Sequence, residues 1–137
     1  MTAKTSPAHK PERKPKSEPG VDLIIESRSL LAEARSTNAA AVKTVVGLSH
    51  LEAILSTVAA GATSERHSDN GPITIQTIIG SVRICLDKER IVLGTGSFMA
   101  LDANVRHTHE GLEDSVVLIT LAWPNSQSGR LRWPEGE

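Results

Sequence analysis

Short segments rich in β-branched residues, separated by glycines and polar turns, constrain the fold of this chain most strongly. The clearest are PITIQTII at 72–79, SVRICL at 81–86 and SVVLITLAW at 115–123. In the second of these, apolar and polar residues alternate, which is the pattern of a strand with one buried face. Strands that recur about every 8–12 residues predict an all-β sandwich or barrel, and a jelly roll is the natural form for a small domain.

The chain has 137 residues, which is enough for one compact domain. The composition divides it into four parts. We expect a disordered basic and proline-rich tail at 1–20, a helical segment at 21–39, the barrel at 40–124 and a C-terminal tail at 125–137.

The helical segment is expected to pack on the outside of the domain. Leu30 and Leu31 give it one apolar side, and Ser27 or Ser29 is the expected N-cap. After it, the segment 40–60 is interpreted as two strands with a turn between them. Its second half also has the propensity of a helix, and the β-rich context favours strands.

Charge and composition exclude several classes of function. The net charge is −1, from 15 basic and 16 acidic residues, so we expect neither a nucleic-acid partner nor a membrane partner. Only Phe98, Trp123 and Trp133 are aromatic, which argues against base-stacking platforms. The single cysteine, Cys85, permits no intramolecular disulfide. Without a secretory signal at the N-terminus or a long apolar run, we expect a cytoplasmic protein.

Two histidines carry the candidate chemistry. His67 and His107 each follow a glycine-led turn, and they are too far apart in the chain for a zinc-finger loop. In a jelly roll, however, such positions can face each other across the barrel. Neutral imidazole is the commonest transition-metal ligand, so the pair suggests a polar pocket or a metal site.

The spacing around these histidines resembles the two motifs of the cupin family. Gly61, His67 and Gly80 stand where the first motif has its first glycine, its first histidine and its last glycine. Gly96 and His107 fit the second motif in the same way. The resemblance covers residues 40–123 and is to the small single-domain cupins, the RmlC-like jelly-roll proteins. It implies a double-stranded β-helix, that is, a jelly-roll barrel with a short N-terminal helix.

The same motifs depart from the cupin pattern at two of the four metal-binding positions. A typical cupin site has three histidines and one glutamate. Here Asp69 stands at the second histidine position, Ile73 at the glutamate position and Gly111 at the asparagine position. The metal-binding motifs are therefore degenerate.

The resemblance and the strand pattern together give a set of candidate site residues. We expect a pocket that contains His67, Asp69, Gln76 and His107. A divalent metal (Fe, Mn, Ni or Zn) would be held by His67 and His107, with Asp69 and His109 as possible further ligands. Gln76 enters the pocket only if a bulge reverses its strand's alternation. Asp69 also suits a turn, so it has a purely structural interpretation.

Two classes of function follow from this site. The first is a small cupin-domain protein that binds a small molecule, a divalent metal or both in the barrel pocket. The alternative is a metal-dependent enzyme, a dioxygenase or an isomerase, that uses His67 and His107 as metal ligands. We also expect a homodimer, because strand edges within 41–60 invite pairing. The fold alone does not choose between these functions.

Overall fold

The computed structural model describes residues 17–66 and 70–123. The tails predicted at 1–20 and 125–137 lie outside these ranges, apart from residues 17–20. The described chain contains one helix and nine strands. They are α1 (Leu23–Thr37), β1 (Val42–Gly47), β2 (Leu51–Val58), β3 (Thr63–Arg66), β4 (Ile73–Ile79), β5 (Ser81–Cys85), β6 (Arg90–Gly94), β7 (Phe98–Leu101), β8 (His107–Gly111) and β9 (Ser115–Ala122).

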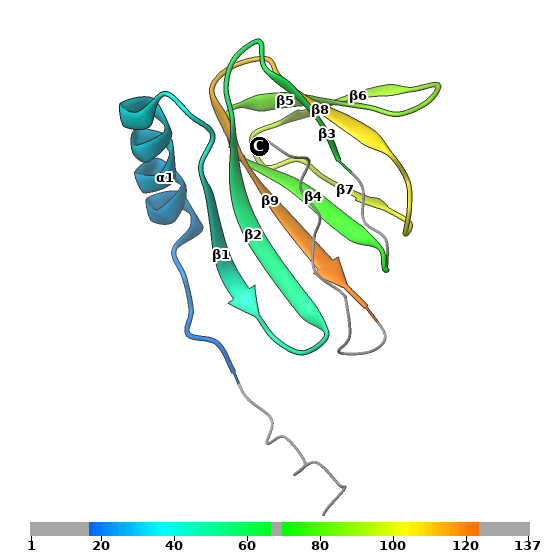
Figure 1. Cartoon of the computed structure of the whole chain (residues 1–137), viewed down its shortest axis with the longest axis horizontal. Coiled ribbons are helices and arrows are strands. Elements are labelled where there is room, and N and C mark those ends of the chain that lie inside the picture. Colours follow the sequence, from blue (N-terminus) through cyan, green and yellow to red (C-terminus); the bar gives the residue numbers. More distant parts are fainter. Residues whose placement is uncertain (1–16, 67–69, 124–137) are drawn as a thin grey trace, which may run out of the picture.

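The strands form two antiparallel sheets that face each other (Figure 1). One sheet has the order β1-β2-β9-β4-β7 and the other has the order β3-β8-β5-β6. Neighbours in each sheet are often distant in the sequence, as in the pairing of β2 with β9 along its whole length. The all-β prediction is confirmed, and the segment 40–60 forms two strands, as expected.

An aliphatic core fills the space between the two sheets. Alternate residues of each strand point inward, as the pleat of a β-strand requires. Ile75 of β4, Ile84 of β5 and Ile119 of β9 are buried at its centre. The other buried members are Ile54, Val58, Ile73, Val82, Leu93, Leu101, Val117, Leu121 and Trp123.

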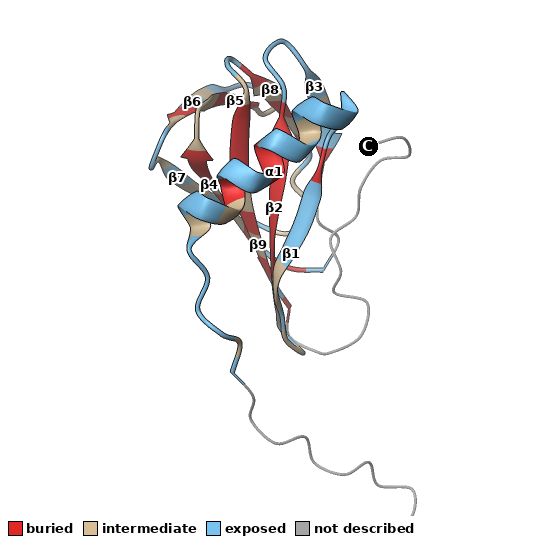
Figure 2. Cartoon of the chain, turned by 90° about the vertical axis from the view of Figure 1, so that its left-hand side faces the viewer, coloured by how far each residue is buried: buried red, intermediate tan, exposed pale blue. Residues whose placement is uncertain are grey.

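Helix α1 lies across the outer face of the five-stranded sheet (Figure 2). Asp22 caps it, because the Asp22 side chain accepts hydrogen bonds of 3.0 Å from the backbone N–H groups of Ile24 and Ile25. The expectation of a cap at Ser27 or Ser29 was therefore wrong: the helix begins earlier, and both serines lie within it. A carboxylate at this position also suits the positive end of the helix dipole.

A second apolar cluster joins α1 to the sheet. Leu30 and Leu31 of the helix pack on Leu55 of β2 and Val116 of β9. These strand residues alternate with those of the interior, so each strand has one face toward the barrel and one face toward the helix. The predicted apolar side of the helix is the side that is buried.

The carboxylate of Asp114, in the turn before β9, ties three segments together. It accepts a 2.9 Å hydrogen bond from the backbone N–H of Ala60, which follows β2, and forms a 3.3 Å ion pair with Arg35 at the end of α1. The Ala60 hydrogen bond, followed by Arg35, lowers the pKa of Asp114 below its ordinary value of 3.8. The folded state therefore favours the ionised carboxylate.

Strand β1 is at one edge of its sheet and pairs with β2. An edge strand is a site at which a second chain can pair. The homodimer stays a prediction, and β1 is the strand through which we expect the two chains to pair. In residues 17–66 and 70–123, no helix has the length and apolarity needed to span a membrane.

Leu55→Ala tests the contact between helix and sheet. Leu55 is fully buried, so we expect the substitution to lower the free energy of unfolding by about 2–5 kcal/mol. Leu112→Ala is the matched control, because Leu112 is 39% exposed, and its effect should be below about 1 kcal/mol. Urea denaturation measures both. Equal effects of the two substitutions would contradict the packing described here.

Asp114→Asn tests the carboxylate tether. At neutral pH the variant should be modestly less stable than the natural protein, because the amide loses the ion pair with Arg35. Since the folded-state pKa of Asp114 is depressed, the carboxylate stabilises the fold above the ordinary pKa of 3.8, and this contribution is lost as the pH falls through the folded-state pKa. The stability difference should therefore shrink in acid. Denaturation at pH 7 and pH 3 measures it, and a difference that grows in acid would refute the role.

Candidate functional site

Strand β8 carries two histidines into the barrel. Its burial alternates, and His107 and His109 are 3% and 0% exposed. His109 lies opposite Ile84 of β5, a residue of the aliphatic core. Because residues directly opposite one another in a sheet share a face, both histidines point into the interior. Their ring centroids are 4.9 Å apart and the rings are tilted by 35°.

The two imidazoles differ in their hydrogen bonds. Nδ1 of His107 lies 3.1 Å from the backbone oxygen of Val105. An N–H at Nδ1 donates to that oxygen. Within the described chain, neither ring nitrogen of His109 has a hydrogen-bond partner. Burying a polar group without a hydrogen-bond partner lowers the free energy of unfolding. The His109 ring therefore does not stabilise the fold through hydrogen bonds.

Burial and charge keep His109 neutral. Its pKa lies well below the ordinary value of 6.5, first because the ring is removed from water, and then because Arg66 and His107 are nearby. A neutral imidazole has one donor nitrogen and one acceptor nitrogen. The interior therefore holds a ring that can both donate and accept a hydrogen bond at neutral pH.

Arg66 is the site residue that the sequence interpretation missed. It was not selected as a site residue from the sequence, yet Arg66 is only 6% exposed. It lies opposite His107, and its Nε donates a 3.1 Å hydrogen bond to Oγ of Ser64. Glu65 points the other way and pairs with Arg106 at 3.2 Å. Strand alternation separates the two neighbours, so only Arg66 lies inside.

Two further polar atoms are buried near the aliphatic core. Oγ of Ser56 and Nε1 of Trp123 have no hydrogen-bond partner among the described residues. Ser56 lies opposite Val117 and so faces the interior. The backbone of Trp123 is held by His50, whose carbonyl oxygen accepts from the Trp123 N–H at 3.2 Å. The interior is thus aliphatic with a few dispersed polar groups, as in many ligand sites.

Gln76 lies outside the barrel. The pairing of β4 with β9 is regular from Ile73 to Thr77, and its irregularity comes only after Thr77. Gln76 therefore stays opposite Leu118, which packs toward α1. The bulge that would turn Gln76 inward does not precede it, so the structure does not bring this side chain to the histidines.

The remaining predicted site residues, His67 and Asp69, lie outside the described residues. Within 17–66 and 70–123, no group of three or more His, Cys, Asp or Glu side chains could hold a metal ion. His107 and His109 supply two nitrogen ligands, and the nearby cation Arg66 opposes a metal ion electrostatically. These residues by themselves do not fit a metal site of the cupin type.

Comparison of the sequence gave no relative: no protein-family model matches it, and no curated protein matches it.

Comparison of the structure gave clear neighbours. A conserved protein of unknown function from Streptococcus pyogenes superposes with a TM-score of 0.60 at 17% identity, over 86% of this chain and 98% of its own. A cupin superfamily protein from Desulfitobacterium hafniense superposes with a TM-score of 0.59 at 18% identity, over 64% of this chain and 80% of its own. This chain has the cupin fold. The predicted jelly-roll barrel with a short N-terminal helix is confirmed.

A further structural neighbour is a larger protein, of which this chain matches only a part. A salicylate 1,2-dioxygenase from Pseudaminobacter salicylatoxidans superposes with a TM-score of 0.59 at 11% identity, over 72% of this chain and 32% of its own. At this identity the likeness concerns the fold. In the cupin barrel of this chain, the site must be judged from its own residues.

His109→Leu tests whether the buried imidazole is kept at a cost in stability. Replacing an unpartnered polar ring by an apolar side chain of similar size should raise the free energy of unfolding of the ligand-free protein by about 1 kcal/mol or more. Thr108→Val, on the outer face of the same strand, should change it by less than about 0.5 kcal/mol. Urea denaturation after refolding from denaturant measures both. A His109→Leu variant that is clearly less stable would show that the ring is satisfied within the protein.

Proposed function

We propose that this chain is a small cupin-fold protein that binds a small, oxygen-containing molecule inside its barrel. The observation that carries the proposal is His109, a fully buried imidazole whose two ring nitrogens have no hydrogen-bond partner in the described chain. A bound molecule would supply those partners. The histidines would fix its orientation, and the aliphatic walls would surround the rest of it.

The hydrogen-bonding capacity of the pair defines what the molecule must offer. His109 is neutral and provides one donor and one acceptor. A neutral His107 would add an acceptor at Nε2, because its Nδ1 donates to the Val105 carbonyl oxygen. A hydroxyl group satisfies the acceptors, and a carbonyl or ether oxygen satisfies the donor. These complementary groups support an oxygenated ligand over a hydrocarbon.

A metal-dependent enzyme, a dioxygenase or an isomerase, is the second candidate. The side-by-side placement of the two imidazoles, with ring centroids 4.9 Å apart, favours it, and one structural neighbour is named a dioxygenase. The described residues supply only His107 and His109, so the site would need further ligands such as His67 and Asp69. In that case a bound Fe, Mn, Ni or Zn ion would polarise a substrate oxygen.

Native mass spectrometry of the protein purified under mild conditions tests the proposal. We expect an additional mass of a small organic molecule on the natural chain and on Thr108→Val. We expect no such mass on His109→Leu, because that variant lacks both ring nitrogens. Retention of the molecule by His109→Leu would exclude the histidine site as its anchor.

Elemental mass spectrometry of the same samples separates the two candidates. For a binding protein without a metal, we expect a metal content far below one ion per chain, and chelation should leave the melting temperature unchanged. Near-stoichiometric Fe, Mn, Ni or Zn that disappears in His107→Ala would instead support the metal-dependent enzyme.

The homodimer and the cytoplasmic location stay predictions, which size-exclusion chromatography and cell fractionation can test.

A further inference from the structure

The side chain of Ser56, on β2, is a buried hydroxyl without a hydrogen-bond partner. The residue is 0% exposed, and its Oγ has no partner within 17–66 and 70–123. Two other buried hydroxyls are satisfied: that of Thr77 donates to the Leu93 carbonyl oxygen at 3.0 Å, and that of Ser115 donates to the Ser81 carbonyl oxygen at 3.1 Å. An unpaired buried hydroxyl lowers stability, so Ser56 is a candidate contact for a bound molecule.

Ser56 faces the barrel interior and not the helix. Ile54 and Val58, two residues to either side of it, belong to the aliphatic core, whereas Leu55 belongs to the cluster under α1. In the pairing of β2 with β9, Ser56 lies opposite Val117, which is also a core residue. Because alternate residues of a strand share a face, the hydroxyl is directed into the space between the sheets.

Strands β2 and β8 belong to different sheets but end at the same place. Val58 is the last residue of β2, and Gly111 is the last residue of β8. A Cβ atom at Gly111 would lie 2.1 Å from the backbone oxygen of Ala59 and 3.1 Å from Cγ1 of Val58. Glycine lets the two strand ends approach this closely, so β2 and β8 run toward a common contact.

Ser56 and His109 lie at the same level relative to this contact. Each is two residues before the end of its strand, and at about 3.3 Å per residue each is about 7 Å away from the contact along the strand. Both side chains point into the interior, one from each sheet. No hydrogen bond joins them, since neither has a partner in the part of the chain that the structure describes.

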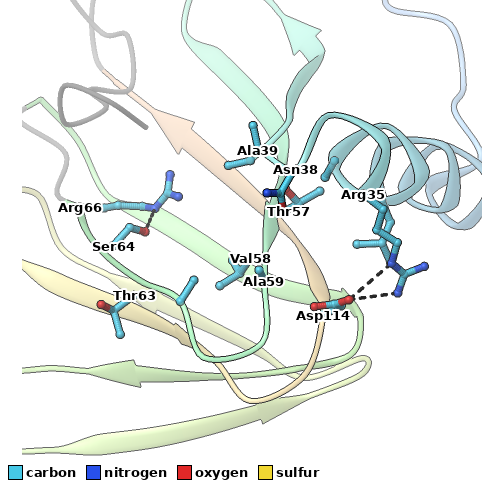
Figure 3. A pocket seen from close by; sticks show the side chains of 14 residues that line it. Arg35, Asn38, Ala39, Thr57, Val58, Ala59, Thr63, Ser64, Arg66 and Asp114 are labelled. Atoms are coloured by element: carbon cyan, nitrogen blue, oxygen red, sulfur yellow. Dashed lines mark hydrogen bonds and ion pairs between the residues drawn. The ribbon is translucent and has the colours of Figure 1, made fainter.

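The cavity in Figure 3 is a separate space. It has a volume of about 310 Å³ and lies between the end of α1, the end of β2 and the start of β3. Thr57, Val58 and Arg66 line it, but Ser56 does not. The Ser56 hydroxyl therefore belongs to the barrel interior, on the level of His109.

We propose that Ser56 and His109 together hold one small molecule with two oxygen functions, a diol or a hydroxy ketone. Neutral His109 offers one donor and one acceptor, and the Ser56 hydroxyl offers a further donor and can also accept. One hydroxyl of the molecule would pair with the imidazole and its second oxygen with the serine, while aliphatic side chains surround its carbon atoms. The inference names the ligand class of the proposed function, on which it rests for the contact at His109.

The isomeric butanediols, each compared with butanol, and hydroxybutanone, compared with butanone, are the probes. Binding is followed on the ¹⁵N-labelled full chain through the backbone amide signals of Ser56 and His109. We expect at least one compound with two oxygens to bind roughly tenfold or more tightly than its counterpart with one, because only the former satisfies both residues. Equal binding within every matched pair, or no shift with any probe, would overturn the proposal.

Ser56→Ala removes the second contact, and Ser27→Ala is its matched control. Ser27 is also 0% exposed, and its Oγ likewise has no partner among the described residues, but it lies on α1, outside the barrel. Ser56→Ala should bind the diol no more tightly than the alcohol, whereas Ser27→Ala should keep the preference of the natural chain. Urea denaturation checks that both variants fold. A preference for the diol that persists in Ser56→Ala would refute the serine contact.

His109→Leu separates this inference from the proposed function. If both hold, the variant should bind neither the diol nor the alcohol, because both compounds use the imidazole. Loss of binding in His109→Leu together with an unchanged preference in Ser56→Ala would overturn the inference and leave the proposed function standing. Unchanged binding by His109→Leu would overturn the proposed function, and loss of the diol preference in Ser56→Ala would then still support the serine contact.

Discussion

The pairing of β8 on both of its sides is the constraint on which the site depends. β3 and β5 hold β8 in a fixed register. This register determines which residues of β8 point into the barrel and which point outward. His107 and His109 are two residues apart and must therefore point the same way, into a core made of Ile, Leu and Val. The same register places Ser64 and Arg66 beside them. A shift of one residue would put all four on the outside.

The interior combines two opposing requirements. Its aliphatic residues stabilise the fold by leaving water, whereas the buried atoms of His109, Ser56 and Trp123 without hydrogen-bond partners in the described chain reduce that stability. Such groups are tolerated where a ligand completes them. In the proposed function, the cupin barrel would supply a rigid, desolvated frame, and the buried polar atoms would orient the bound molecule.

Helix α1 contributes both to stability and to the cavity beside the barrel. Its apolar side covers the five-stranded sheet, while its C-terminal end forms a wall of the cavity. The ion pair of Arg35 with Asp114 fixes this end against the turn before β9. The contacts that anchor the helix thus also define the opening beside Arg66.

The sequence by itself determined the strands, the jelly-roll class, the helix and the inward position of His107, because these follow from local alternation and motif spacing. It left open whether Gln76 points inward, and the late position of the irregularity in β4 decided that it does not. It did not single out Arg66, since β3 reads Thr-Ser-Glu-Arg and has no apolar residue to mark its inner face. Only pairing with β8, forty residues away, buries that arginine and brings it to the histidines. Alternation is a local property, but which face becomes the interior is decided by the strands that meet in the folded chain.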